Sequence, residues 1–405
     1  MTSTRLEYNN DTRRSLRYLR VVAAKELIGH MAALTLAQTR SGPRLYQPPL
    51  PEWYRTASDD ELAERISSAR AMLGNQVVIL CHHYQQEGIF RFADLTGDSF
   101  KLARLAQKRP EAKYIIFCGV HFMAESADIL SQPDQVVILP NLTAGCSMAD
   151  MANIDQVEQC WDDLNEAGCT EVIPVTYINS AANLKAFVGR NGGAVCTSSN
   201  APRILKWAFE HGRQVLFFPD QHLGRNTGRG MGIGLDQMAV WDPEEDFGGN
   251  VPDTLHEKKI LLWKGHCSVH GRFTVDQVEK ARREFPGVRV VVHPECTMEV
   301  VDAADCYGST EFILEEVGRG KPGDIFAIGT EINMVSRLAR QHPDMTIFCL
   351  DPVVCPCSTM YRIHPSYLCW VLNNLLEGRV VNQISVPETV AENARIALDR
   401  MLANG

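Results

Sequence analysis

The sequence lacks the features that would place it in a membrane, in a secretory route or on nucleic acid. None of its apolar stretches approaches about 18 residues, so no transmembrane helix is expected, and no secretory apolar segment stands near the N-terminus. An excess of positive charge is also missing, because Lys plus Arg is 40 and Asp plus Glu is 49, a net charge of −9. Such a balance does not favour nucleic acid or an anionic membrane as a partner. We therefore expect a cytoplasmic protein that binds neither.

Several catalytic signatures are missing as well. The chain has no G-x-S-x-G elbow, no HExxH and no protein-kinase signature. The Gly-rich stretch 224–254 has neither the spacing of a P-loop nor a strand–GxGxxG–helix pattern, and we interpret it as a loop over the site. The pair Cys355 and Cys357 is CxC and not CxxC, which does not indicate a thioredoxin-type couple.

Cysteine, by contrast, is abundant, with 13 in 405 residues. In a reducing compartment such thiols serve as packing groups, metal ligands or nucleophiles. Cys146, Cys267 and Cys357 each follow a short apolar run that predicts a strand, and they are 121 and 90 residues apart. Only the global fold can bring them together. Three thiolates would leave a position open on a metal or iron–sulfur centre, whereas the alternative is that all three are buried core cysteines.

From residue 76 onward, apolar strands alternate with helical segments in a degenerate threefold repeat. This alternation predicts the α/β class, with three pseudo-threefold-related three-layer α/β/α domains and parallel sheets around a central site. We expect an N-terminal extension with helices over residues 1–75. Three α/β domains should follow, over residues 76–150, 151–270 and 271–405, and the third includes C-terminal helices. Ligands of parallel sheets gather beyond the carboxyl ends of the strands, where the polar motifs of this chain stand.

The N-terminal segment is rich in arginine. Its first 44 residues hold seven Arg and one Lys against three acids, and residues 21–37 have apolar side chains at helical spacing. The acids argue against a transit peptide. We expect a partly helical extension without an assigned role.

Polar motifs follow the first predicted strand of each unit. They are Cys-His-His-Tyr-Gln at 81–85, Tyr-Ile-Asn at 177–179 and His-Pro-Glu at 293–295. Hydroxyl-rich turns precede helices at Ser99, at residues 196–200 and at 308–310. These turns suit carboxylate or phosphate, although ordinary helix caps would give the same residues.

In order and spacing, these motifs resemble the quinolinate synthase family, in its longer subtype. The resemblance covers roughly residues 76–400 and rests on HxYQ followed by GDS, then GCSMAD, YIN, CTSSNA, PDQHLGRNT, KGHC, HPEC, GST and CSTMYRIHP. It implies three α/β/α domains around a [4Fe–4S] cluster with one open iron that acts as a Lewis acid. It also implies a reaction of de novo NAD biosynthesis, the condensation of iminoaspartate with dihydroxyacetone phosphate to quinolinate, phosphate and water. The iminoaspartate could be transferred from an L-aspartate oxidase or dehydrogenase.

The resemblance also implies roles for individual residues. The cluster ligands would be Cys146, Cys267 and Cys357, with Cys355 as the alternative to the third. The catalytic residues would be Tyr84, Tyr177, Asn179 and Glu295. The substrate-binding residues would be His82, Ser99, Tyr177, Ile178, Asn179, Ser198, His293, Pro294, Glu295, Ser309 and Thr310.

Two other functional classes fit three converging cysteines. One is a different three-cysteine [4Fe–4S] enzyme of the same layout, such as those of diphthamide synthesis or isoprenoid reduction. The other is a non-catalytic iron–sulfur redox sensor, which the surplus of cysteines could suggest. The YIN and HPE motifs argue against the first class. A sensor should need a partner surface, and no apolar patch or basic helix in the sequence indicates one.

Overall fold

The computed structural model describes residues 46–106, 108–353 and 356–404. Its contacts divide the chain into one unit of residues 1–46 and a second of residues 47–405, and the account below concerns the second. The helix expected over residues 21–37 and Cys355 lie outside the described residues. The described chain belongs to the α/β class, as the alternation of strands and helices predicts.

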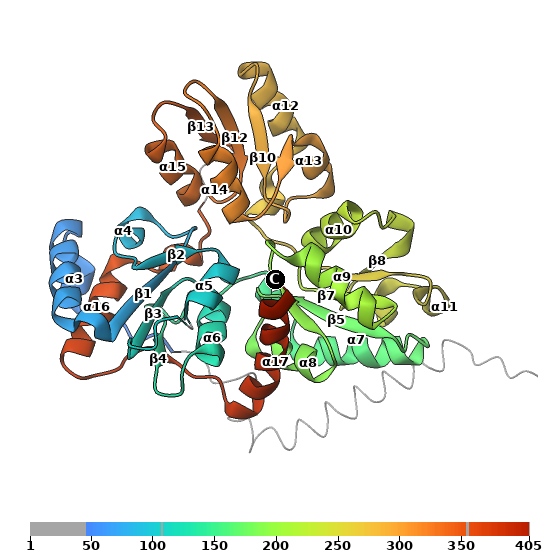
Figure 1. Cartoon of the computed structure of the whole chain (residues 1–405), viewed down its shortest axis with the longest axis horizontal. Helices are drawn as coiled ribbons and strands as arrows, with labels where there is room; N and C mark the ends of the chain where they lie inside the picture. Colours follow the sequence, from blue (N-terminus) through green and yellow to red (C-terminus); the bar gives the residue numbers. More distant parts are fainter. Residues whose placement is uncertain (1–45, 107, 354–355, 405) are drawn as a thin grey trace, which may run out of the picture. The chain divides into compact units, whose positions relative to one another are not determined.

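Three sheets form the framework (Figure 1). The first has the order β14-β4-β3-β1-β2 and the second the order β6-β5-β7-β9-β8, while the third has the order β11-β10-β12-β13. The strands of the first sheet are β1 (Val77–His82), β2 (Leu95–Gly97), β3 (Tyr114–Cys118), β4 (Val136–Ile138) and β14 (Gln383–Ile384). Those of the second are β5 (Val172–Tyr177), β6 (Ala194–Cys196), β7 (Gln214–Phe218), β8 (Met238–Trp241) and β9 (Ile260–Trp263). Those of the third are β10 (Arg289–Val292), β11 (Cys306–Tyr307), β12 (Ile325–Gly329) and β13 (Thr346–Cys349).

The three sheets repeat one topology. In each, the first strand in sequence lies between the second and the third, and a fourth strand of the unit lies beyond the third. Every pairing is parallel except that of β14 with β4. All six residues of β1 are buried, as expected for a parallel strand that helices cover on both faces. The predicted threefold arrangement is therefore confirmed.

Helices cover these sheets and connect their strands. The α-helices are α2 (Glu52–Thr56), α3 (Asp59–Leu73), α4 (Glu87–Phe90), α5 (Ser99–Ala106), α6 (His121–Leu130), α7 (Ile154–Glu166), α8 (Ala182–Arg190), α9 (Ala201–His211), α10 (Gln221–Gly230), α11 (Pro252–Leu255), α12 (Val275–Glu284), α13 (Met298–Ala303), α14 (Thr310–Gly318), α15 (Ile332–Gln341), α16 (Pro365–Leu376) and α17 (Glu388–Asn404). Short 3₁₀ helices are η1 (Gly74–Gln76), η2 (Ala149–Met151), η3 (Leu235–Gln237), η4 (Asp246–Gly249), η5 (His270–Arg272) and η6 (Met360–Arg362).

The C-terminal part of the chain returns to the first two sheets. Helix α16 packs against α3, β14 extends the first sheet, and α17 packs against α8 and β6. The contacts divide the chain only between residues 46 and 47. The domain boundaries near residues 75, 150 and 270 therefore stay a prediction.

The stretch 224–254 is not the loop over the site that we expected. It contains the second half of α10, then η3, then β8, which joins the edge of the second sheet beside β9. A side chain at Gly224 would come within 2.6 Å of Leu262 and Phe217, so this glycine lets α10 approach the sheet closely. Gly224 therefore serves the packing of a helix on strands.

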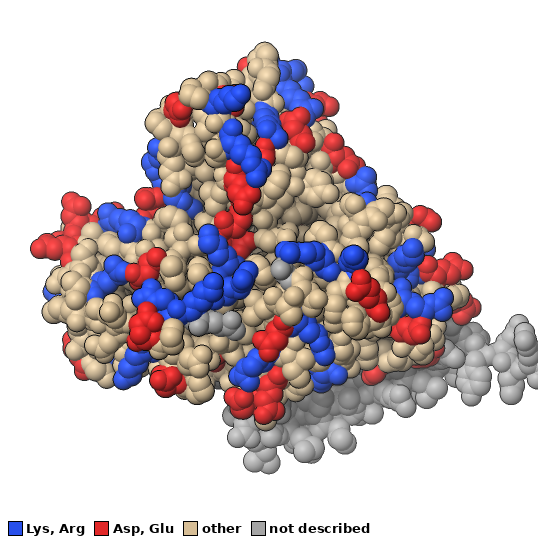
Figure 2. Space-filling view, in the orientation of Figure 1, with Lys and Arg blue, Asp and Glu red and all other residues tan. Residues whose placement is uncertain are grey.

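No helix among the described residues is long and apolar enough to cross a membrane. On the face that Figure 2 shows, acidic and basic side chains are interspersed.

Candidate active site and metal centre

A pocket lies where the carboxyl ends of strands from all three sheets come together. Twelve of the predicted site residues line it, namely His82, Tyr84, Ser99, Cys146, Tyr177, Asn179, Ser198, Cys267, His293, Glu295, Thr310 and Cys357. The pocket is thus built by residues that are up to 278 positions apart in the sequence, from His82 to Met360. Parallel strands explain the gathering, because their carboxyl ends lie at one edge of each sheet.

The residues after β1 and β10 have the same local geometry. The backbone N–H of Tyr84 donates to Nδ1 of His82 at 3.2 Å, and that of Glu295 donates to Nδ1 of His293 at 3.3 Å. Burial, together with the positive charges of neighbours, lowers the pKa of both imidazoles to about 3. Each ring is therefore neutral, and since Nδ1 accepts, the ring hydrogen is on Nε2. Both histidines can donate a hydrogen bond to a bound anion.

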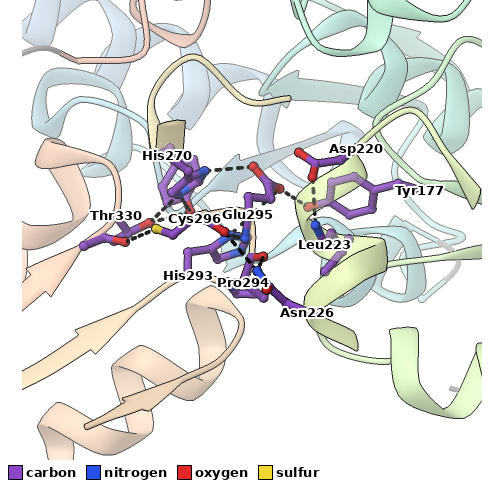
Figure 3. A network of polar contacts seen from close by, with 12 residues as sticks. Tyr177, Asp220, Leu223, Asn226, His270, His293, Pro294, Glu295, Cys296 and Thr330 are labelled. Atoms are coloured by element: carbon purple, nitrogen blue, oxygen red, sulfur yellow. Dashed lines mark hydrogen bonds and ion pairs between the residues drawn. The ribbon is translucent and has the colours of Figure 1, made fainter. Parts of the chain in front are cut away.

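Glu295 is the acceptor at the centre of a buried network (Figure 3). Its Oε1 accepts from the Tyr177 hydroxyl at 2.6 Å, and its Oε2 lies 2.8 Å from Nδ1 of His270. Burial opposes ionisation, but the charge of His270 and these hydrogen bonds outweigh it and lower the pKa of Glu295. The pKa of Tyr177 is raised well above its usual value by burial and by the charge of Glu295. A carboxylate and a phenol that holds its proton therefore stand side by side.

The three cysteines lie in equivalent turns. Cys146, Cys267 and Cys357 follow β4, β9 and β13, the strands that pair with the third strand of each unit on the side away from the first. In each turn the N–H four residues on donates to the cysteine carbonyl, at 3.1, 2.9 and 2.9 Å. A 3₁₀ helix begins three residues after each cysteine, at η2, η5 and η6. The twelve cysteines that the structure describes are all free thiols, and these three are half-buried.

This equivalence bears on the choice between Cys357 and Cys355. Each of the three cysteines is followed directly by a serine, whereas Cys355 is followed by Pro356. Cys355 itself lies outside the described residues. Cys357 occupies the position in its unit that Cys146 and Cys267 occupy in theirs.

Hydroxyls at helix starts form another part of the pocket. Ser99 and Thr310 are the first residues of α5 and α14, and both line it. The Thr310 Oγ1 is buried and has no hydrogen-bond partner among the described residues, and the same holds for Oδ1 of Asn179. Buried polar atoms without a partner are uncommon in folded proteins, so these two, which face the pocket, are candidates to bind a ligand.

Three predicted residues lie outside the lining of this pocket. The Ser309 hydroxyl accepts from the N–H of Phe312 at 3.3 Å and so caps α14. Ile178 is buried, and its N–H donates to the Cys196 carbonyl. The Pro294 carbonyl accepts from Nδ2 of Asn226 at 2.9 Å. Each of them adjoins a residue that does line the pocket.

Two further residues that line the pocket, His270 and Glu331, were not predicted from the sequence. His270 follows Cys267 by three residues, and ligand atoms of Cys267, His270 and Glu295 all lie within 4.8 Å of one another. Glu331 follows β12, and its Oε1 accepts from the Cys357 N–H at 3.2 Å. Burial raises the pKa of Glu331 to about 7. Glu331 stands just beyond the carboxyl end of the third strand in the third unit. This position could have indicated it, since ligands gather at the carboxyl ends of parallel strands.

The rest of the lining consists of further residues without a predicted role. They are Asp98, Val120, Phe122, Met123, Met148, Thr197, Val269, Thr359 and Met360. Asp98 accepts from the Lys101 N–H at 2.8 Å and from the Ser199 hydroxyl, and so joins the first sheet to the second.

Comparison with known proteins identifies the family. The family model described as Quinolinate synthetase A protein matches residues 64–403. The quinolinate synthase of Corynebacterium glutamicum is 62% identical over 358 residues, which cover 88% of this chain and 91% of the relative. That of Acidobacterium capsulatum is 56% identical over 353 residues (86% and 94%), and that of Geobacillus thermodenitrificans is 52% identical over 355 residues (87% and 96%). The chain therefore belongs to the quinolinate synthetase A family.

Proposed function

We propose that this protein condenses iminoaspartate with dihydroxyacetone phosphate to give quinolinate, phosphate and two waters in de novo NAD biosynthesis. The observation that carries the proposal is the convergence, in one pocket, of three equivalent cysteine turns with His82, His293 and Glu295. The reaction forms a carbon–carbon and a carbon–nitrogen bond and expels phosphate and water. It needs sites for carboxylates, a site for phosphate and groups that move protons.

The cysteines fit an iron–sulfur cluster. Thiolates are its usual ligands, and Cys146, Cys267 and Cys357 are free, half-buried and placed on three equivalent turns of one pocket. We propose that they hold a [4Fe–4S] cluster, which supplies an open iron as a Lewis acid when it is bound.

The neutral histidines are suited to the carboxylates of iminoaspartate. Nε2–H of His82 and of His293 is available to donate, because Nδ1 of each ring is occupied by a backbone N–H. Asn179 adds a buried amide oxygen that lacks a partner in the described chain, and it can accept from the imine nitrogen. Ser99 and Ser198 bring further hydroxyls to the pocket.

The start of α14 is suited to the phosphate. The unpartnered Thr310 hydroxyl stands at the first residue of this helix, where backbone N–H groups and the helix dipole favour an anion. Ser309, Ile178 and Pro294 remain proposed substrate contacts. The Ser309 hydroxyl, the backbone N–H of Ile178 and the Pro294 carbonyl already make hydrogen bonds within the chain.

Proton transfer falls to the two phenols and Glu295. Glu295 is positioned to accept a proton, since its lowered pKa keeps it a carboxylate. Tyr84 and Tyr177 hold their protons, because burial and the charge of Glu295 raise the pKa of both well above the usual value. They are thus suited to protonate the leaving hydroxyl groups and to orient the imine.

The supply of substrate and the location follow from this chemistry. An imine hydrolyses in water, so we propose that an L-aspartate oxidase or dehydrogenase delivers iminoaspartate to the enzyme. Free thiols and a labile cluster require a reducing compartment, which supports a cytoplasmic location.

The test is an anaerobic assay with iminoaspartate generated in place and dihydroxyacetone phosphate added. We expect quinolinate and equimolar phosphate from protein that contains the cluster. Folded, cluster-containing protein that forms no quinolinate would overturn the proposal in favour of another iron–sulfur enzyme or a redox sensor. Folded anaerobic protein that binds no cluster would overturn the cluster assignment.

A further inference from the structure

A line of hydrogen bonds joins Tyr84 to Glu295 by way of Thr330 and His270. The Tyr84 hydroxyl lies 2.7 Å from Oγ1 of Thr330, and this oxygen lies 3.1 Å from Nε2 of His270. Nδ1 of His270 then lies 2.8 Å from Oε2 of Glu295. Figure 3 shows Thr330, His270 and Glu295 in this order. The Tyr84 hydroxyl is 3.5 Å from Nε2 of His270, at the limit of a hydrogen bond, so Thr330 makes the connection.

Thr330 stands at a junction of the three units. It follows β12 of the third sheet, while Tyr84 follows β1 of the first and His270 follows β9 of the second. Thr330 and His270 are each 1% exposed. The Thr330 side chain is not part of the pocket lining, so it acts on a substrate only through Tyr84 or His270.

The direction of each bond follows from its acceptors. An ionised carboxylate only accepts, so Nδ1 of His270 donates to Glu295. In the neutral imidazole Nε2 must then accept, so the Thr330 hydroxyl donates to it and accepts from Tyr84. In the imidazolium, Nε2–H of His270 donates to the Thr330 oxygen, which can still accept from the Tyr84 hydroxyl with its second lone pair. Thr330 bridges the two rings in either form, because a hydroxyl both donates and accepts.

We propose that Thr330 is a positioning residue that fixes the Tyr84 phenol for proton transfer and links it through His270 to Glu295. This inference rests on the proposed function of the same pocket. The hydrogen bond to Thr330 fixes the direction of the Tyr84 hydroxyl, which could otherwise rotate about its C–O bond. The Tyr84 oxygen keeps a lone pair for the substrate. A group held in this way reacts faster than one that must first find its orientation.

Two substitutions separate the hydroxyl from the shape of the side chain. Thr330→Val keeps the branched shape and removes the hydroxyl, while Thr330→Ser keeps the hydroxyl. For T330V we expect kcat to fall roughly 10- to 100-fold with KM within about twofold, since the lost interaction acts on proton transfer and not on binding. We expect T330S to retain most of kcat, and both variants to keep the cluster absorbance near 400 nm of the parent.

A control addresses the general cost of deleting a buried hydroxyl. Thr227 is buried on α10, whose described residues do not line the pocket, and T227V should leave kcat unchanged. T330V with the parent's kcat, or T330S as slow as T330V, would overturn the inference. If the parent itself makes no quinolinate, the proposed function fails first.

A crystal structure of T330V tests the positioning without turnover. We expect the Tyr84 ring to leave its place beside His270 or to occupy several orientations. A Tyr84 hydroxyl that keeps its distance to Nε2 of His270 would overturn the inference whatever the activity.

Discussion

The residues after β1 and after β10 share one backbone arrangement and differ in the side chain that it presents. In both, a histidine accepts the N–H two residues on, and the residue in that position faces the pocket. That residue is Tyr84 in the first unit and Glu295 in the third. The first holds its proton and the second is ionised, so one turn displays a proton donor in one unit and an acceptor in the other. The repeat supplies the placement, and single residues supply the chemistry.

Substitutions in the cysteine turns, which are alike in the three units, should have the largest effect on the protein, the loss of its proposed cluster. We expect Cys146→Ala, Cys267→Ala and Cys357→Ala each to abolish stable cluster assembly, measured as iron and sulfide content after anaerobic purification. Cys355→Ala should be milder, because Cys355 lacks the following serine that the other three share. A C355A variant without a cluster, beside a C357A variant that has one, would exchange the two assignments.

The next largest effect should be a loss of turnover when Tyr84 or Glu295 is replaced, the residues that differ between the turns after β1 and β10. We expect Glu295→Gln and Tyr84→Phe to keep the cluster and to lower kcat by roughly 10²- to 10⁴-fold, the usual contribution of a general acid or base. Each substitution removes a proton-transfer group and leaves the histidine and its backbone bond in place. Near-normal rates in either variant, with intact cluster absorbance, would show that the difference between the turns is not catalytic.

Smaller effects are expected at the start of α14, where replacing Thr310 should weaken substrate binding and replacing Ser309 should lower stability. Thr310→Val should raise KM for dihydroxyacetone phosphate by about tenfold or more, because a hydrogen bond to a charged group contributes roughly 1.5 to 3 kcal/mol. Ser309→Ala should instead cost about 1 kcal/mol of stability as a lost helix cap, with KM unchanged. The reverse pattern in steady-state kinetics and chemical unfolding would place the phosphate on Ser309.

The smallest effect, a change in how stability depends on pH, tests whether His82 and His293 are in similar environments. Burial lowers the pKa of His82 and of His293 from 6.5 to about 3, so the unfolded chain binds protons that the folded chain does not. Their contribution to stability is complete above pH 6.5 and is lost as the pH falls toward 3. Each should add about 1.4 kcal/mol per pH unit to the slope of the unfolding free energy of cluster-free protein.

His82→Gln and His293→Gln should each reduce that slope by the same amount between about pH 4 and 6. Urea unfolding at several pH values measures it. Unequal changes in slope would show that the two turns hold their rings in different environments.

Much of this arrangement was predictable from the sequence, because it depends on local patterns. Apolar runs that end in polar motifs predict strand tips, and the tips of parallel strands share an edge. Tyr84, Tyr177 and Glu295 could be found in this way. The same reasoning identifies Cys146 and Cys267 as equivalent positions of a repeat, although the roles of all these residues remain predictions.

The residues that sequence reasoning missed gain their place only from distant contacts. Thr330 bonds Tyr84 across 246 positions, and His270 contacts it across 186. Neither residue type indicates such a contact beforehand, since a threonine after a strand is common in any fold. The prediction for the stretch 224–254 was wrong for another reason, because its glycines suggest a loop, whereas Gly224 permits a helix to lie close to strands.

The return of α16, β14 and α17 to the first two sheets has a consequence for biosynthesis on the ribosome. β14 completes the first sheet beside β4, and α17 covers α8 of the second unit. Neither of these units, which together provide most of the pocket, can reach its final packing while residues 365–404 are still in the exit tunnel. The cluster that we propose would therefore be inserted after release of the chain, when all three cysteine turns are available at once.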